Sequence, residues 1–526
     1  MPTKDNNSIM LSTDTAGGRN SGYQYLPSSS NSNTPRSPNQ ELLPLTATVN
    51  SRDCLEIGGC DVMTLVERFG SPLYILDEVT LRTTCRQYRE ALIRYYPGES
   101  LAIYASKAWS CLAVCAIAAS EGLGIDVVSG GELYTALEAG VSADKIYFHG
   151  NNKSRAELEL AIESGCTIVV DNWFELHTLK ELNVEGCKVE GSEGLNVDKL
   201  LAQRGEAQVE GSAQTNLQPA NLQPATFHQP ANLPPEGIRI MLRLTPGIEC
   251  HTHEYIRTGH LDNKFGFDPN DLDELFTFVS QHPTLNCIGI HAHIGSQIFE
   301  LQPHRDLAGV LVDYMSKAAG YGLSIQTLNV GGGLGIRYTE SDDPPSIDEW
   351  VKGVAEAIAN ACQQQQLPLP RLMCEPGRSL IGSACVTAYR LGSRKVVPEI
   401  RTYLSVDGGM SDNPRPITYQ SLYRAVVANR MSAPAIETVT IAGKHCESGD
   451  ILIKEATLPQ TEAEDILVVM STGAYNYSMA SNYNRLPRPA AVLVSEGEAN
   501  LILKRETYQD LIRQDRLPER LIPIND

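Results

Sequence analysis

Short apolar runs alternate with helix-length amphipathic segments through the middle of the chain. The predicted strands are residues 101–105, 124–128, 145–148, 167–170, 239–244, 287–291, 327–330 and 371–374. The helices predicted beside them include residues 108–120, 132–139, 155–164, 272–281, 305–319 and 347–363. Eight strands that each neighbour a helix match the count of a (β/α)8 barrel. Periodicity alone leaves a doubly wound sheet open as the alternative.

The pattern changes after about residue 379, where short β-rich runs are separated by Gly, Pro and Asp turns. Strands are predicted at residues 385–391, 396–397, 403–406, 438–442, 466–470 and 490–494. This texture predicts a separate C-terminal β domain, a sandwich or β-barrel, over residues 379–526. An early segment, residues 49–77, carries a helix pattern at 61–69 and a strand pattern at 72–76, and we expect it to join that domain.

Two segments lack any core-forming pattern. Residues 1–48 are rich in Ser, Asn, Thr and Pro, so they bury too little apolar surface to offset their ordering entropy, and we expect disorder. Residues 190–236 repeat NLQPA at 216–220 and 221–225, and their regularly spaced prolines exclude a helix. We expect this insert to be a solvent-exposed loop within a barrel domain of residues 78–378.

Composition narrows the class of protein. The chain is 42% hydrophobic and 20% charged, as is usual for a globular enzyme, and its formal charge of −20 argues against nucleic-acid and anionic-membrane partners. Thirteen cysteines without a CxxC pair indicate reduced thiols and a cytoplasmic protein. No apolar run reaches the roughly 18–20 residues of a membrane span. The Ser-rich, acid-poor N-terminus keeps an organellar location as the alternative.

Lys107 is the first candidate for chemistry. It follows the apolar run at 101–105 and precedes a helix-prone segment, and α/β barrels place their catalytic groups at such strand ends. Loss of hydration there is expected to lower the pKa of the lysine and make it an amine nucleophile. A lone lysine at a strand end more commonly extends its ammonium into solvent, so Lys107 needs support from its neighbours.

Polar and glycine clusters follow several other predicted strands. His291, His293 and Ser296 follow one strand, the triplet 331–333 follows the next, and the last strand ends in the cluster 374–378. Glycines after a strand expose backbone N–H groups that can bind phosphate, although glycines also simply make turns. A lysine, a phosphate cradle, a flat histidine and a carboxylate on one rim fit pyridoxal phosphate. We predict no metal site.

The motifs make this more specific. They are YASKA around Lys107, GIDVVSGGELYTAL at 124–137, NKFGF at 263–267, HIGSQ at 293–297, GGGLGI at 331–336, EPGRS at 375–379, HCESGD at 445–450 and GAYNYSMASNYN at 473–484. In this content and order the chain resembles the diaminopimelate decarboxylase family, which belongs to the alanine-racemase-like fold-type III pyridoxal phosphate enzymes. The resemblance runs from about residue 55 to 521 and omits the insert.

The resemblance implies how the cofactor, pyridoxal 5′-phosphate, is bound. Lys107 would form the Schiff base, His293 would stack on the ring, and Glu375 would pair with the pyridine nitrogen. The other cofactor contacts that it implies are Ser296, Gly332, Gly333, Gly377, Arg378 and Tyr475.

The resemblance also implies a substrate, meso-2,6-diaminopimelate, converted to L-lysine and CO2. Arg378, Arg415 and Tyr419 would bind its distal carboxylate and Glu447 its distal ammonium, with Tyr475 close by. Cys446 would donate a proton from the second subunit of a homodimer.

Three alternatives stay open at this stage. A related decarboxylase of the same fold would act on ornithine, arginine, lysine or carboxynorspermidine, which mostly lack a distal carboxylate, so Arg415, Tyr419 and Glu447 disfavour it. A non-catalytic pyridoxal phosphate carrier would typically lack the proton donor or the substrate-binding groups, and this chain keeps both. Glu375 disfavours a racemase, because a carboxylate keeps the pyridine nitrogen protonated.

Overall fold

A computed structural model of the chain describes residues 20–27, 37–185, 237–248 and 263–521. The predicted insert at 190–236 lies outside the described residues, as do residues 1–19. Within the described part, no helix combines the length and the apolar character needed to cross a membrane.

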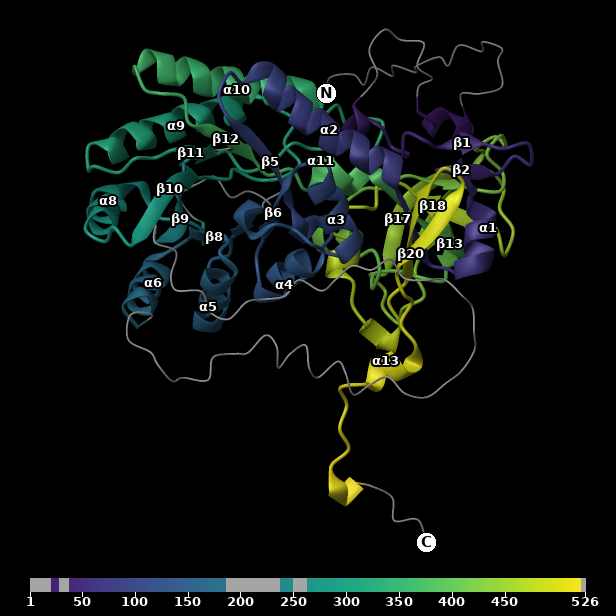
Figure 1. The fold of residues 1–526 in the computed structure, drawn as a ribbon. Helices are drawn as coiled ribbons and strands as arrows, with labels where there is room; N and C mark the ends of the chain where they lie inside the picture. Colours follow the sequence, from purple (N-terminus) through teal and green to yellow (C-terminus); the bar gives the residue numbers. More distant parts are fainter. Residues whose placement is uncertain (1–19, 28–36, 186–236, 249–262, 522–526) are drawn as a thin grey trace, which may run out of the picture.

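Eight parallel strands of the described chain close into a barrel (Figure 1). In order they are β5 (Ser100–Ala105), β6 (Gly124–Val127), β7 (Ile146–Phe148), β8 (Thr167–Val170), β9 (Ile238–Arg243), β10 (Leu285–His291), β11 (Thr327–Asn329) and β12 (Arg371–Cys374). β12 pairs back onto β5, with Met373 beside Leu101. The predicted barrel is therefore confirmed and the doubly wound sheet is excluded. Side chains from five of these strands, Leu101, Ile103, Tyr147, Val169, Met241 and Met373, form an apolar cluster of their own.

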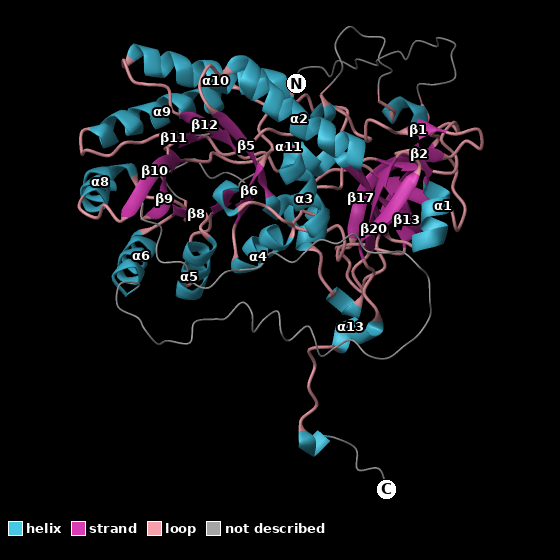
Figure 2. Cartoon of the chain, in the orientation of Figure 1, coloured by secondary structure: helices cyan, strands magenta, loops and turns pink. Residues whose placement is uncertain are grey.

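Helices surround the barrel (Figure 2). They are α2 (Glu78–Tyr95), α3 (Leu112–Ser120), α4 (Gly130–Glu138), α5 (Arg155–Ser164), α6 (Trp173–Glu185), α8 (Leu272–Ser280), α9 (Gln302–Ala319) and α10 (Ile347–Gln364). Local sequence fixes their ends. α5, for example, begins at a capping box between Ser154 and Glu157 and ends at Gly165, whose φ of 76° suits glycine.

The helix after β5 starts later than its predicted first residue, 108. Ser106–Ala108 forms a single 3₁₀ turn, and the chain extends at Trp109 before α3 begins at Leu112. Trp109 is fully buried and stacks on Tyr477 at 5.7 Å, while its carbonyl accepts the Tyr104 hydroxyl at 3.1 Å. Packing of this large side chain outweighs the local helix propensity, so Lys107 lies on a turn instead of a helix.

A second unit is built on a nine-stranded sheet of the described residues, as expected for the β domain. Its main path runs β17 (Ile451–Leu458), β16 (Glu437–Ala442), β14 (Arg401–Val406), β13 (Cys385–Val397), β4 (Leu73–Asp77), β19 (Ala490–Ser495) and β20 (Glu498–Leu503). β18 (Ile466–Val469) pairs with β13 and β15 (Ala425–Val427). A small sheet of β1 (Thr48–Val49), β2 (Leu55–Ile57) and β3 (Cys60–Asp61) precedes α1 (Val62–Phe69). The short helix α11 (Arg378–Ile381) adds Leu380 and Ile381 to the core around the barrel, and α12 (Arg415–Tyr419) and α13 (Tyr508–Ile512) follow later in the chain.

One strand of this sheet, β4, comes from the segment that precedes the barrel in the chain. β4 lies between β13 and β19, pairing antiparallel with the first and parallel with the second. The boundaries that we place at residues 78 and 378 stay a prediction.

Residues 37–48 differ from the disorder expected for the whole of 1–48. Leu42 and Leu43 are buried in the core of the sheet unit, and Asn39 donates to the carbonyls of Gly335 and Pro345 at 3.2 and 2.9 Å. A few apolar residues and one buried amide are enough to order this stretch. The prediction of disorder used the average composition of residues 1–48, in which these few residues have little weight.

Candidate active site

A cavity of about 780 Å³ opens where the barrel strands end. The predicted site residues that line it are Lys107, His293, Ser296, Gly332, Gly333, Glu375, Gly377, Arg378, Arg415, Tyr419 and Tyr475. Further lining comes from residues that the sequence analysis did not assign, among them His149, Arg243 and Tyr338. Cys446 and Glu447 do not line it. The fold thus gathers side chains from opposite halves of the chain into one site.

Lys107 is fixed by its neighbours on both sides. The Ala105 N–H donates to the Pro376 carbonyl at 3.1 Å, and the Tyr475 N–H donates to the Ala108 carbonyl at 2.7 Å. Burial lowers the pKa of Lys107, but Asp126, Tyr475 and Glu375 outweigh it and raise the pKa above its usual value. The expectation of a lowered pKa is therefore wrong for this arrangement, because anionic neighbours hold the ammonium.

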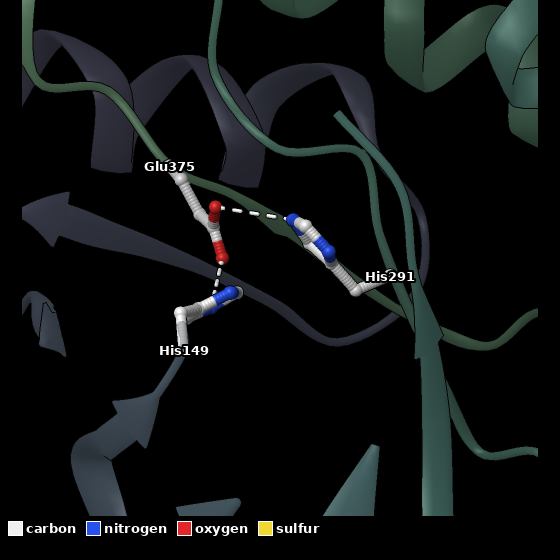
Figure 3. A group of neighbouring side chains, drawn as sticks. All are labelled: His149, His291 and Glu375. Atoms are coloured by element: carbon white, nitrogen blue, oxygen red, sulfur yellow. Dashed lines mark ion pairs between the residues drawn. The ribbon is translucent and has the colours of Figure 1, made fainter. Parts of the chain in front are cut away.

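Glu375 is clamped between two imidazoles (Figure 3). Its Oε1 lies 2.8 Å from His149 Nε2 and accepts Asn329 Nδ2 at 2.7 Å, and its Oε2 lies 3.3 Å from His291 Nε2. Burial raises the pKa of Glu375, but the histidines outweigh it and bring the pKa well below its usual value. A buried carboxylate is thus kept ionised, as a partner for a protonated ring nitrogen requires.

The same trio, His149, His291 and Glu375, also matches a metal-binding set by residue type, since its ligand atoms lie within 4.8 Å of one another. Each imidazole nitrogen, however, faces one oxygen of the same carboxylate. We therefore interpret the trio as a support for Glu375.

His293 and the glycine triplet form one wall of the cavity. The Gly332 N–H donates to His293 Nδ1 at 3.2 Å, which requires that nitrogen to be unprotonated. Burial and Lys107 keep the pKa of His293 well below its usual value. A Cβ on Gly331, which has a φ of 65°, would lie 2.7 Å from His293 Nδ1, and one on Gly332 would collide with the Glu375 carbonyl. Only glycine leaves this wall open, so the wall suits a flat ring bearing a phosphate.

Two buried arginines meet at the cavity. Arg378 donates from Nε and Nη2 to Ser296 Oγ at 3.1 and 3.0 Å and from Nη1 to the Tyr338 hydroxyl at 2.8 Å. Arg415 donates to the same Tyr338 oxygen at 2.7 Å and to the Tyr423 hydroxyl at 2.8 Å. Among the described residues neither guanidinium forms an ion pair with a carboxylate, so both charges are available to an anionic ligand.

Cys446 and Glu447 lie on the loop between β16 and β17 and are exposed. The Cys446 N–H donates to Asn484 Oδ1 at 3.0 Å, and Glu447 Oε2 accepts the Tyr483 hydroxyl at 3.4 Å. This chain therefore holds the two residues at its surface, apart from its own cavity.

Some cavity residues could have been found by the same strand-end rule that drew attention to Lys107. His149 directly follows the predicted strand 145–148, and Arg243 is the last residue but one of the predicted strand 239–244. Asp126 lies near the end of the predicted strand 124–128 and also lines the cavity. It precedes a helix cap in which Ser129 accepts the Glu132 N–H at 3.2 Å. Tyr338 stands in a loop and carries no such signal.

Buried histidines predict acid sensitivity of the fold. Burial lowers the pKa of His304 and of His291 to about 4. Because the folded state binds fewer protons than the unfolded chain between about pH 4 and 6.5, their contribution is complete above pH 6.5 and is lost as the pH falls. For His304 alone this is about 3 kcal/mol.

We expect the free energy of unfolding, measured by denaturant titration at a series of pH values, to fall across this window. In His304→Gln the decrease in the free energy of unfolding should be smaller by the contribution of His304, about 3 kcal/mol. Equal slopes for the two proteins would contradict the assignment.

A known protein family matches the barrel that carries this cavity. Residues 79–190 and 225–382 match the family described as pyridoxal-dependent decarboxylase, pyridoxal binding domain. The match covers the barrel strands and ends just after the Glu375–Arg378 turn.

Relatives extend the match to most of the chain. It is 60% identical over 494 residues to a diaminopimelate decarboxylase of Synechocystis sp., covering 92% of this chain and 95% of the relative. It is 42% identical to a diaminopimelate decarboxylase of Bacillus subtilis, covering 89% of this chain and 97% of that one.

A solved structure shares the whole architecture. The diaminopimelate decarboxylase of M. jannaschii in co-complex with L-lysine superposes with a TM-score of 0.74 at 30% identity, covering 91% of this chain and 99% of that one. The lysine/ornithine decarboxylase of Vibrio vulnificus, at 20% identity and a TM-score of 0.62, shares the fold.

Proposed function

Because the chain belongs to the diaminopimelate decarboxylase family of pyridoxal-dependent decarboxylases, we propose that it converts meso-2,6-diaminopimelate to L-lysine and CO2. The observation that carries the proposal is the placement of two carboxylate-free arginines, Arg378 and Arg415, in the same cavity as Lys107 and Glu375.

Pyridoxal 5′-phosphate, when bound, would withdraw the electron pair left on Cα as CO2 departs. Lys107 would supply the amine that attaches it, and the ionised Glu375 would keep the ring nitrogen protonated. Neutral His293 offers a flat face, and the wall at Gly331–Gly333 gives room for the phosphate. Lys107 must lose a proton before it acts, and Asp126, Tyr475 and Glu375 oppose that loss because they raise its pKa.

The substrate's distal end would bind beyond the ring. Its carboxylate matches the two guanidinium groups, which can each donate more than one hydrogen bond to an oxyanion. Tyr419 lines the same cavity.

A second copy of the chain would complete the site. Cys446 and Glu447 are exposed and lie outside the cavity of their own chain, which supports a homodimer in which Cys446 of the partner subunit donates the proton to Cα. Glu447 of the partner subunit would bind the distal ammonium. Free, mostly buried cysteines support a reducing compartment, which we take to be the cytoplasm or an organellar stroma.

The alternative is a decarboxylase of a basic amino acid without a distal carboxylate. Such a substrate would bring a cationic end toward Arg378 and Arg415, whose charges no described carboxylate pairs. Like charges in a buried site repel strongly, so the cavity disfavours these substrates.

We expect CO2 release from meso-diaminopimelate, and none from L-lysine, ornithine or arginine, when each is offered to the purified protein with pyridoxal phosphate. Arg415→Leu should raise KM for diaminopimelate by about tenfold or more, because a charged hydrogen-bond donor is lost. CO2 release from ornithine or arginine would agree with the proposed cofactor site but would contradict diaminopimelate as the substrate. A loaded protein that releases CO2 from none of the four would indicate a non-catalytic carrier.

A further inference from the structure

We propose that Tyr338 is a specificity-determining residue that holds Arg378 and Arg415 at the spacing of a single carboxylate. This rests on the proposed function, in which the two arginines bind the distal carboxylate of the substrate. Tyr338 lies on the loop after β11, is buried, and lines the cavity with both arginines.

The phenol oxygen of Tyr338 is the acceptor that the two guanidiniums share. Arg378 donates to it at 2.8 Å and Arg415 at 2.7 Å. The centres of the same guanidiniums lie 5.9 and 5.0 Å from the centre of its ring. Two like charges that would otherwise repel are thus brought to one oxygen. A substrate carboxylate oxygen next to it can accept further hydrogen bonds from the same two guanidiniums.

The electrostatics of this group agree with the geometry. Burial raises the pKa of Tyr338, but Arg378 and Arg415 outweigh it and lower the pKa. Asp342, a carboxylate on the same loop, does not take over this role. Its Oδ2 accepts the N–H groups of Tyr338 and Thr339 at 3.0 and 2.8 Å, so it fixes the loop that carries Tyr338.

Tyr423 offers a matched comparison. Its hydroxyl also accepts from Arg415, at 2.8 Å, and its ring meets that of Tyr338 edge to face at 5.3 Å. In the described part of the chain, however, it forms no hydrogen bond with Arg378, and it does not line the cavity. A tyrosine that only supports Arg415 can therefore be separated from one that joins the two arginines.

The test uses the holoenzyme of Tyr338→Phe with Tyr423→Phe as the control. We expect Tyr338→Phe to raise KM for meso-diaminopimelate by about tenfold, with kcat within about threefold, because a hydrogen bond between charged and polar groups is lost at the non-reacting end. Inhibition by L-lysine, which keeps a carboxylate at that end, should weaken by the same factor. Inhibition by cadaverine, which has no carboxylate, should not change.

Tyr423→Phe should change KM and lysine inhibition less than Tyr338→Phe does. Thermal unfolding and the cofactor absorbance of each variant establish that it is folded and loaded. If Tyr338→Phe folds too poorly to assay, Tyr338→His should keep lysine inhibition closer to wild type than cavity-enlarging Tyr338→Ala does, because it retains an acceptor nitrogen on a shorter ring.

Unchanged KM and lysine inhibition in Tyr338→Phe would overturn the inference, as would an equal loss of lysine and cadaverine binding. Arg415→Leu separates this from failure of the proposed function. If that variant raises KM and Tyr338→Phe does not, only the role of Tyr338 fails. If neither raises KM, the arginines do not bind the substrate.

Discussion

Lys107→Ala is expected to abolish the absorbance near ~420 nm that pyridoxal phosphate shows when linked to a lysine. Turnover should fall on the order of 10³-fold or more, because the covalent anchor and the amine that positions the substrate for exchange are both lost. The structure places this side chain in the cavity, on a turn fixed by Pro376 and Tyr475. The turn Ser106–Ala108 contains no other lysine that could replace it.

Lys145→Ala is the control for this experiment. Lys145 stands just before β7 and does not line the cavity, so the spectrum and turnover of that variant should match wild type. An unchanged spectrum in Lys107→Ala would remove Lys107 from the cofactor site.

Cys446→Ala is expected to lower turnover by about 10²- to 10⁴-fold, the usual contribution of a positioned acid, while the cofactor absorbance stays. The thiol lies outside the cavity of its own chain, so its loss should not disturb the groups around Lys107. Cys385→Ala, at a fully buried thiol in β13, serves as the control for cysteine removal and should affect stability more than chemistry.

Mixing Cys446→Ala with Lys107→Ala distinguishes a shared site from a site within one chain. If the partner subunit supplies Cys446, random re-association of equal amounts should restore about a quarter of wild-type activity, since half of the dimers are mixed and each has one complete site. Activity that stays at the level of the separate variants would contradict the shared site.

The barrel could be predicted from the sequence because its strands are buried on both faces and read as continuous apolar runs. Thr167–Val170 and Arg371–Cys374 match their predicted ranges, and the others shift by a residue or two. The strands at the two edges of the second sheet, β17 and β20, were harder to predict. β17 contains Lys454 and Glu455 on exposed positions, and β20 begins with Glu498, so both lack an apolar run and were not predicted.

The residues of the candidate site likewise include some that the sequence could predict and some that it could not. Lys107, Glu375 and the glycine triplet sit in motifs at strand ends, so their clustering followed once the barrel was assumed. The direction of the Lys107 pKa did not follow, because it depends on Asp126 and Glu375, which only the closed barrel brings close. Tyr338 was missed because its role arises from contacts with residues 40 and 77 positions away. The roles of Cys446 and Glu447 stay predictions.

The position of β4 bears on how the protein is made by the ribosome. Leu73 pairs with Ala490, more than 400 residues later, so β4 emerges long before the strand that lies beside it. At about 5–20 residues per second, β4 waits about 20–80 s for that partner, while every barrel strand has already been synthesised. Its Leu73, Tyr74, Ile75 and Leu76 are fully buried in the finished sheet. During synthesis this apolar strand therefore needs protection from aggregation until β13 and then β19 have emerged to cover its two edges.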